Sequence, residues 1–472
     1  MKKFWLVLLS LGLFMAFSAS AFAVDVKISG SFYAAGMYLN KTKVADIEGT
    51  SDGKGGYLSN PSTAFFYQRL RVETDFIIDP SLKLITRFDA MERIWGGQRS
   101  APGTTLALDS AGTSSENENI AFDWAYINYK SPVGTFEVGI MNYGATGTIF
   151  GNGYYPAGRI KYYSNPINGS FNINADFSKL GDKSYSAVNS SALWTDADKD
   201  AYAIEGVYSW KDGKAALKGF YYRYADNRPP TSLTTPNALR DYFVVTPWTI
   251  FKIGPVALQA ELNYAFGKYS RYDDYVNHVT TPDVRMENIS GWIDATATFA
   301  PVYVGGTPAY VSGDDPGTKD VKEGGTLTGG FEWNPCLIMF NYYDVSNWVG
   351  PVYGNDSTAP TSLGASGTGM LTGPMSNAWF GQGRIGVKPI PQLDVMMSIS
   401  YAQADKKPNG YANSTYGTEV DLTGTYKITD NLSYMLGFGY LFTGDYFKGK
   451  DTPPDNKVVD DFILMNKLTL TF

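Results

Sequence analysis

The sequence is dominated by segments of about ten residues in which apolar and polar side chains alternate, each followed by a turn-like link. Residues 170–178, 393–401 and 419–428 show this pattern most clearly. Because successive side chains of a β-strand point to opposite faces, each segment has one apolar and one polar face. The pattern predicts an all-β chain. Alternation alone does not separate a soluble β-sandwich, whose apolar faces point inward, from a membrane barrel, whose apolar faces point outward.

The links between these segments favour the barrel, because short and long links alternate along the chain. The short links are eight: 79–81, 131–134, 165–169, 211–213, 254–255, 300–301, 389–392 and 429–431. The long links are rich in Gly, Ser, Thr, Asn and Asp: 40–62, 96–119, 181–199, 227–238, 269–285, 313–325 and 346–376. An up-and-down barrel has tight turns at one end and long loops at the other. Eight turns and one strand at each terminus predict a transmembrane antiparallel up-and-down β-barrel of about 18 strands, within roughly 16 to 20.

The least regular stretch is 326–345, which contains Pro335 and Cys336. It is either a hairpin that adds two strands or a packed insertion inside a long loop. The apolar run around Pro335 alternates poorly, which favours the insertion.

The first 23 residues have the three parts of a Sec-type signal peptide. Lys2 and Lys3 precede an apolar stretch at 4–17, and Ala21 and Ala23 form a small-x-small cleavage site. The apolar stretch is shorter than the ~20 residues that span a bilayer as a helix. We therefore expect cleavage after Ala23, so that 1–23 is a signal peptide.

The remaining chain, 24–472, is expected to form one outer-membrane barrel with long extracellular loops. It has no second candidate for a spanning helix, so it would enter a membrane only as a barrel. The 39 Lys+Arg against 46 Asp+Glu argue against a nucleic-acid binder, and 15% aromatic residues argue against disorder. The single Cys336 suits an exported protein without disulfides.

The C-terminal residues, NKLTLTF, place Leu468, Leu470 and Phe472 on one face of a terminal strand. An alternating last strand that closes on a C-terminal Phe resembles the signal of bacterial outer-membrane barrels, which their barrel-assembly machinery reads.

With the leader and the strands throughout, the whole of 24–472 resembles Gram-negative outer-membrane porins, and 306–320 (GTPAYVSGDDPGTKD) resembles the alginate-export type. This resemblance implies a homotrimeric barrel in the outer membrane, surrounded by lipid and lipopolysaccharide. It implies passive diffusion of small hydrophilic solutes and ions through a water-filled channel. It also implies a loop folded into the lumen after the fifth strand. Here the fifth strand is 134–142, so that loop is 143–158, which lacks the acidic residues that general porins place there.

Two neighbouring segments, 64–78 and 82–95, carry charges on one face and apolar residues on the other. An Arg or Lys at mid-depth on a lipid face costs roughly 2–4 kcal/mol, so these charges are predicted to line the pore. The candidate constriction residues are Arg69, Arg71, Glu73, Asp75, Arg87, Asp89 and Arg93. Two interpretations remain open: a transverse field that filters ions, or ion pairs that only keep the pore wet.

Aromatic residues at segment ends are expected to form girdles at the headgroup level. They are Trp95, Trp124, Tyr129, Tyr143, Trp210, Tyr224, Trp248, Tyr401 and Tyr446.

Other functions are disfavoured. The single His278 sits in a predicted loop without an oriented serine, so no catalytic residues, no metal site and no cofactor are predicted, and the chain is not expected to be an enzyme. The acidic loop 312–323 is interpreted as solvated charge rather than a calcium site. The alternatives that remain are a substrate-selective channel for a sugar or organic anion and, less favoured, a barrel enzyme or an adhesin.

Overall fold

The computed structural model describes residues 24–45, 50–51, 57–58, 60–96, 121–182, 197–225, 238–272, 282–350, 352, 354, 371–450 and 457–472. The predicted signal peptide, with Ala21 and Ala23, lies outside these residues, as does His278. Cleavage and the boundary of the barrel domain therefore stay predictions.

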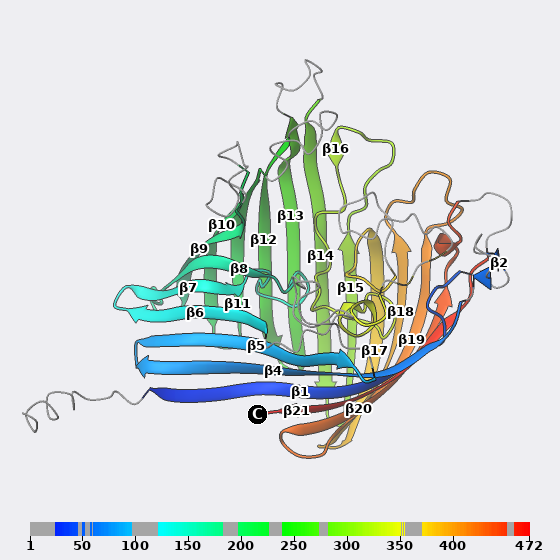
Figure 1. Cartoon of the computed structure of the whole chain (residues 1–472), viewed down its shortest axis with the longest axis horizontal. Coiled ribbons are helices and arrows are strands. Elements are labelled where there is room, and N and C mark those ends of the chain that lie inside the picture. The colour runs from blue at the N-terminus through cyan, green and yellow to red at the C-terminus, as the bar shows by residue number, and fades with distance from the viewer. Residues whose placement is uncertain are drawn as a thin grey trace, which may run out of the picture.

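The described chain forms a closed antiparallel β-barrel of 18 strands (Figure 1), which confirms the predicted all-β fold and strand number. The barrel strands are β1 (Asp25–Leu39), β4 (Thr63–Asp79), β5 (Leu82–Ile94), β6 (Ala121–Ser131), β7 (Gly134–Asn142), β8 (Pro156–Ser164), β9 (Phe171–Gly181), β10 (Lys199–Trp210), β11 (Gly213–Tyr224), β12 (Ala238–Ile253), β13 (Val256–Tyr272), β14 (Val284–Phe299), β15 (Val302–Val311), β17 (Ala378–Ile390), β18 (Leu393–Ala404), β19 (Thr415–Lys427), β20 (Leu432–Thr443) and β21 (Asp461–Thr471).

The barrel closes where β1 pairs with both β4 and β21. The backbone of Phe472 exchanges two hydrogen bonds with Gly30, so the last residue is tied into the first strand. Short elements lie outside the barrel wall: β2 (Thr50–Ser51) pairs with β3 (Tyr57–Leu58), β16 (Val321–Lys322) pairs parallel to β14, η1 is Tyr342–Ser346 and η2 is Asp445–Lys448.

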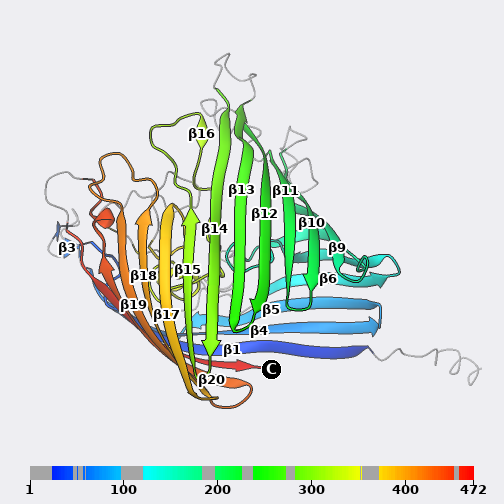
Figure 2. The ribbon, with the colours of Figure 1, turned by 180° about the vertical axis from the view of Figure 1, so that it is seen from behind.

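The eight short links predicted from the sequence are tight turns between paired strands, all at the same end of the barrel. The strand ends from which the long links leave lie at the opposite end of the barrel. Figure 2 shows β12, β13 and β14 in front of β1, β4 and β5, with their directions crossing, because the tilted strands of opposite walls run across one another.

Residues 326–345 form an insertion and not a hairpin: of these residues only 342–345 belong to an element, the start of η1. The insertion fills the lumen beside β19, and its side chains Trp333, Ile338 and Phe340 are buried. The name "insert" is used below for residues 326–350.

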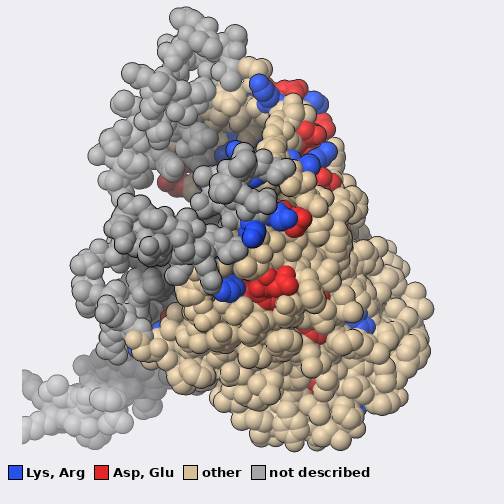
Figure 3. Space-filling view, turned by 90° about the vertical axis from the view of Figure 1, so that its right-hand side faces the viewer, with Lys and Arg blue, Asp and Glu red and all other residues tan. Residues whose placement is uncertain are grey.

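Alternation along the strands separates an apolar outer face from a polar inner face. On β19, Leu422 points outward and is 50% exposed, while Glu419 and Asp421 point into the barrel and are buried. Similar exposed apolar side chains occur around the wall, for example Ile204 and Leu436. In Figure 3 the charged side chains gather over the upper part of the face, and the lower part carries few. Among the described residues, no helix is long and apolar enough to cross a membrane.

The aromatic side chains expected at the headgroup level divide into two groups. Trp95, Tyr129, Trp210 and Tyr401 are exposed on the outer face. Trp124 packs on Arg87 in the lumen, and Tyr143, Tyr224 and Trp248 also line the lumen, while Tyr446 is buried in η2. The girdle prediction was therefore wrong for these five. Strand register turns Trp124, Tyr224 and Trp248 to the lumen, whereas Tyr143 and Tyr446 lie outside the barrel strands.

Candidate functional site in the barrel lumen

The inner face of β4, β5 and β6 holds a network of arginine–carboxylate pairs. The Arg71 guanidinium donates to both oxygens of Asp89, from Nε to Oδ1 at 2.6 Å and from Nη2 to Oδ2 at 2.5 Å. Arg87 Nε donates to Asp123 Oδ2 at 3.2 Å, and Arg71 Nη2 lies 3.7 Å from the same oxygen. The bidentate geometry fixes the direction of the Arg71 fork, so these charges form a rigid wall.

Aromatic rings cover the arginines of this wall. The Arg87 guanidinium carbon lies 3.6 Å from the centre of the Trp124 ring and 4.6 Å from that of Tyr154. Tyr154 also lies 5.6 Å from Arg71. A guanidinium over a ring face is held by the ring quadrupole, so Tyr154 links the loop that carries it to the charged wall.

A β-bulge at Met91 changes which residue of β5 joins the wall. Met91 has a φ of 54°, and the pairing of β4 with β5 shifts there. As a result Glu92 is buried beside Arg69, with 3.9 Å between Arg69 Nη1 and Glu92 Oε1, while Arg93 pairs with Gln68. Gln68 lies on the face of β4 that points outward with Phe66. The predicted place of Arg93 on the pore-lining face is therefore corrected, because one extra residue inverts the alternation.

The other predicted residues lie nearer the turn end of the same wall. Asp75 accepts a hydrogen bond from Lys83 Nζ at 2.9 Å, and Glu73 lies opposite Arg87 in the strand pairing. The structure thus brings together Arg69, Arg71, Glu73, Asp75, Arg87 and Asp89 on one inner surface.

The loop 143–155 leaves β7 and runs into the lumen. Its Thr148 hydroxyl donates to the buried carboxylate of Glu261 on β13, and Phe150 stacks on Trp292 of β14 with 5.7 Å between ring centres. The strands β8 to β12 separate β7 from β13 along the wall, so the loop crosses the barrel. At Gly147 a Cβ atom would lie 2.1 Å from the Trp248 ring, so only glycine fits this close approach.

Carboxylate hydrogen bonds hold the insert against β19, β4 and β21. Both oxygens of Glu419 on β19 accept backbone amides of the insert, from Ile338 at 2.6 Å and from Met339 at 2.7 Å. Asp344 accepts from Tyr67 of β4 at 2.8 Å and from Lys467 of β21 at 3.1 Å. The insert is therefore fixed to three strands.

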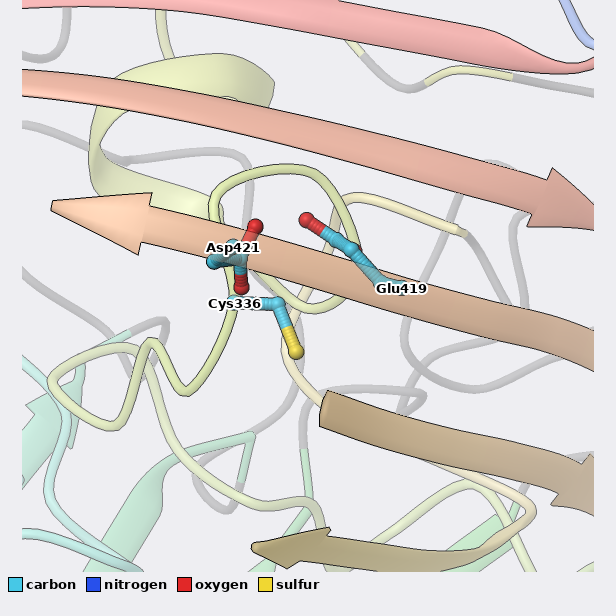
Figure 4. A group of neighbouring side chains, drawn as sticks. All are labelled: Cys336, Glu419 and Asp421. Carbon is cyan, nitrogen blue, oxygen red and sulfur yellow. The ribbon is translucent and has the colours of Figure 1, made fainter. Parts of the chain in front are cut away.

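Cys336, Glu419 and Asp421 form a buried group whose ligand atoms lie within 4.8 Å of one another (Figure 4). Such a set has the donor types of a metal site. The two Glu419 oxygens, however, already serve the amides of the insert, and Ser398 Oγ lies 3.4 Å from Asp421 Oδ2. We interpret the group as the anchor of the insert.

The loop and the insert contact one another and narrow the lumen. The Phe331 amide donates to the Asn152 carbonyl at 2.8 Å, and Tyr155 packs on Phe331 with 5.3 Å between ring centres. Burial and the nearby Glu332 carboxylate raise the pKa of Tyr343 to about 12, against the opposing effect of Arg71 and Arg69. Tyr343 thus stays a neutral hydrogen-bonding group within reach of the arginine wall.

A second network of hydrogen bonds and ion pairs, on β8 and β9, joins barrel residues to one another. The buried Arg159 donates to Ser178 Oγ at 2.8 Å, to Asp176 at 2.7 Å and to the Asn142 carbonyl, and Lys218 lies 3.7 Å from Asp176. Its donors are used by the barrel itself, so this network serves to position the base of the loop.

The acidic loop 312–323 is paired with one lysine of its own and with one from the loop after β18. Lys322 Nζ donates to Asp314 at 2.6 Å, and Lys406 Nζ lies 3.5 Å from Asp315. A hydrogen bond from the Gly317 amide lowers the pKa of Asp315. Lysines therefore pair with Asp314 and Asp315 of this loop.

Several lumen residues were not foreseen from the sequence: Glu92, Asp123, Tyr154, Glu261, Glu419 and Asp421. A carboxylate inside an apolar alternating segment was available as a signal at Asp123, Glu261 and Glu419. Nothing in the local sequence indicates that Tyr154 contacts two arginines of distant strands.

No protein-family model matches the chain, and no curated relative matches it in sequence. Solved structures with a similar fold include OccK8 (OprE) of Pseudomonas aeruginosa, which is 13% identical, covers 94% of this chain and 98% of its own, and has a TM-score of 0.48. The anion-selective porin of Comamonas acidovorans is 9% identical over 95% of this chain and 99% of its own, with a TM-score of 0.44. The outer membrane channel DcaP of Acinetobacter baumannii is 13% identical over 96% of this chain and 99% of its own, with a TM-score of 0.42. These likenesses concern the fold, and the function has to be argued from this chain's own lumen.

We expect the thiol of Cys336 to resist modification while the barrel is folded. Burial, with a further contribution from Glu419 and Asp421, raises the pKa of this thiol well above its usual value, so the reactive thiolate is suppressed at neutral pH. Maleimide labelling followed by mass spectrometry measures this. The variant Asp430→Cys, in an exposed turn, serves as the reactive control. Labelling of Cys336 as fast as the control in folded protein would contradict its burial.

Proposed function

We propose that the chain forms a water-filled channel in the outer membrane of a Gram-negative bacterium, through which small hydrophilic solutes and ions diffuse passively. The observation that carries this proposal is the division of one closed barrel into an apolar outer face and a charged inner face. A large apolar surface in water is unfavourable, and a belt of it around a closed barrel fits a lipid environment. The polar inner wall keeps the passage hydrated.

The insert favours a selective channel over a wide general pore. It is buried against β4, β19 and β21, and the loop 143–155 occupies the lumen from the other side. In this proposal the passage runs beside the arginine wall, near Tyr154 and Tyr343. A passage bounded by charged and phenolic groups discriminates by size, charge and hydrogen bonding.

Further expectations belong to this proposal. The leader 1–23 directs export, the terminal strand with Leu468, Leu470 and Phe472 is read by the barrel-assembly machinery, and the barrel assembles as a homotrimer among lipid and lipopolysaccharide. Leu468 and Leu470 of β21 and Phe472, which follows it directly, are exposed on the outer face, where another protein can reach them. The lumen groups serve passage and positioning, so no enzymatic activity is proposed.

Liposome swelling tests the proposal. Vesicles with the folded protein are expected to swell in isotonic arabinose and more slowly in isotonic sugars of increasing size, because the loop and the insert narrow the lumen. Vesicles with heat-unfolded protein are the control. Absence of swelling in every solute with folded protein would overturn the proposal, and equal rates for all sizes would overturn its selective form.

A further inference from the structure

A cavity of about 240 Å³ lies between the loop 143–155, the insert and the inner wall of β11, β12 and β13. Its lining is rich in aromatic rings, hydroxyl groups and glycine backbone. The rings and polar side chains are Tyr143, Tyr155, Phe220, Tyr222, Tyr224, Tyr242, Phe331, Thr146, Thr246, Asn263, Thr326 and Thr328. Among the described residues, no Asp, Glu, Lys or Arg lines it. The cavity lining itself is uncharged. The charged side chains nearest to its rings, Arg159 on Tyr143 and Lys218 on Phe220, are both paired with Asp176.

The rings form an ordered series on the wall. Tyr222 stacks on Tyr242 of the next strand, with 4.8 Å between ring centres and 24° between planes, and on Phe220 at 5.6 Å and 14°. Tyr143 of the loop meets Tyr222 edge-on at 6.4 Å. The residue before Tyr222 on β11, Tyr221, lies on the outer face against Phe243. Strand alternation therefore places equivalent rings on both sides of the same wall.

Polar groups stand beside these rings. The Thr246 hydroxyl donates to Asn263 Oδ1 at 2.7 Å, which leaves the lone pairs of the hydroxyl oxygen able to accept from a ligand. Gly144, Gly151 and Gly153 of the loop bring backbone, without side chains, to the cavity surface. A ligand here meets apolar ring surface on one side and hydrogen-bonding groups on another.

This combination selects one class of solute. A charged solute would lose hydration without a counter-charge in the lining. A purely apolar solute would make no hydrogen bond to the threonine hydroxyl groups of the lining. A sugar ring has C–H faces that pack on aromatic rings and a rim of hydroxyls that donate and accept.

We propose that this cavity is a binding subsite for one ring of a neutral sugar on its way through the channel. The inference rests on the proposed channel function and adds a substrate class to it. Sugars then pause at the tyrosines, while the arginine wall remains free for ions.

Single-channel recording tests the subsite, with glucose, maltose and sucrose added to a potassium chloride solution. We expect a saturable, reversible block of the ion current by at least one of them. Tyr222→Ala is expected to weaken the apparent affinity about ten-fold, through loss of a stacked ring. Tyr222→Phe keeps the ring and is expected to stay within about two-fold, and Tyr221→Ala, on the outer face of the same strand, is expected to bind as the unaltered chain does.

The outcomes separate the two proposals. Ion steps without block by any of these sugars overturn the subsite and leave the channel standing, whereas no ion steps at all overturn the channel. If Tyr221→Ala and Tyr222→Ala weaken the apparent sugar affinity equally, the subsite is overturned. A stronger block by sodium gluconate than by glucose also overturns it, because a neutral lining disfavours the carboxylate. Heat-modifiable migration on a gel shows that each variant folds. If Tyr222→Ala does not fold, Tyr143→Ala in the loop takes its place.

Discussion

Replacing Glu419 with Ala is expected to loosen the insert and to raise the unitary conductance while lowering stability. The buried carboxylate accepts the amides of Ile338 and Met339, and no other acceptor is provided for them when it is removed. Each buried amide left without a partner costs roughly 1–3 kcal/mol. The insert is then held less firmly against β19, so it leaves the wall more often and widens the passage. Urea unfolding in detergent and conductance in planar bilayers measure the two results.

Two further variants serve as controls for the role of the Glu419 carboxylate. Glu419→Gln keeps one carbonyl acceptor and is expected to fall between the unaltered chain and Glu419→Ala. Val420→Ala removes a neighbouring side chain of the outer face and is expected to leave the conductance unchanged. If Glu419→Ala has the unfolding midpoint and the conductance of the unaltered chain, the carboxylate does not anchor the insert.

Replacing both Arg71 and Arg87 with Ala is expected to shift the ion selectivity toward cations. The change leaves Asp89 and Asp123 on the inner wall without these two guanidinium partners. In water, a unit charge about 8 Å from a passing ion contributes about 0.5 kcal/mol, so two such charges change the local concentration of cations about six-fold before screening. The reversal potential in a gradient of potassium chloride measures this, and low salt enlarges the effect because screening is weaker.

The matched control removes negative charges instead of positive ones, so the reversal potential is expected to shift in the opposite direction. Asp89→Asn together with Asp123→Asn removes the negative partners, keeps the side-chain shapes and is expected to shift the reversal potential toward anions. An unchanged reversal potential in both double variants would show that the wall is a set of internal ion pairs that only keeps the passage wet. This experiment decides between the two interpretations left open by the sequence.

The fold could be predicted from the sequence because the strands and the turns are both marked by local sequence patterns. Alternation marks each strand, and Pro, Gly, Asn and Asp mark the turns, as at Asp79-Pro80-Ser81 and at Lys211-Asp212-Gly213. The same alternation placed Arg71, Arg87 and Asp89 on one inner wall. An Arg or Lys at mid-depth on the lipid face costs roughly 2–4 kcal/mol, so in a strand without a bulge the charged face turns to the lumen.

The remaining features depend on contacts that local patterns do not encode. The bulge at Met91, a non-glycine residue with positive φ, exchanges the faces of Glu92 and Arg93. The loop 143–155 is held by Thr148 on Glu261 and by Phe150 on Trp292, partners more than a hundred residues away. Tertiary contacts of this kind decide the shape of the lumen, and with it the selectivity.

The measurement that tests the central claim most directly is the conductance of the purified, folded chain in a planar lipid bilayer. The account predicts discrete, stable current steps in potassium chloride, in groups of three if the barrel is a trimer. It also predicts that steps become larger in Glu419→Ala. A chain that folds to the heat-modifiable form and inserts into the bilayer but gives no current steps would contradict the proposal that the barrel encloses an open passage.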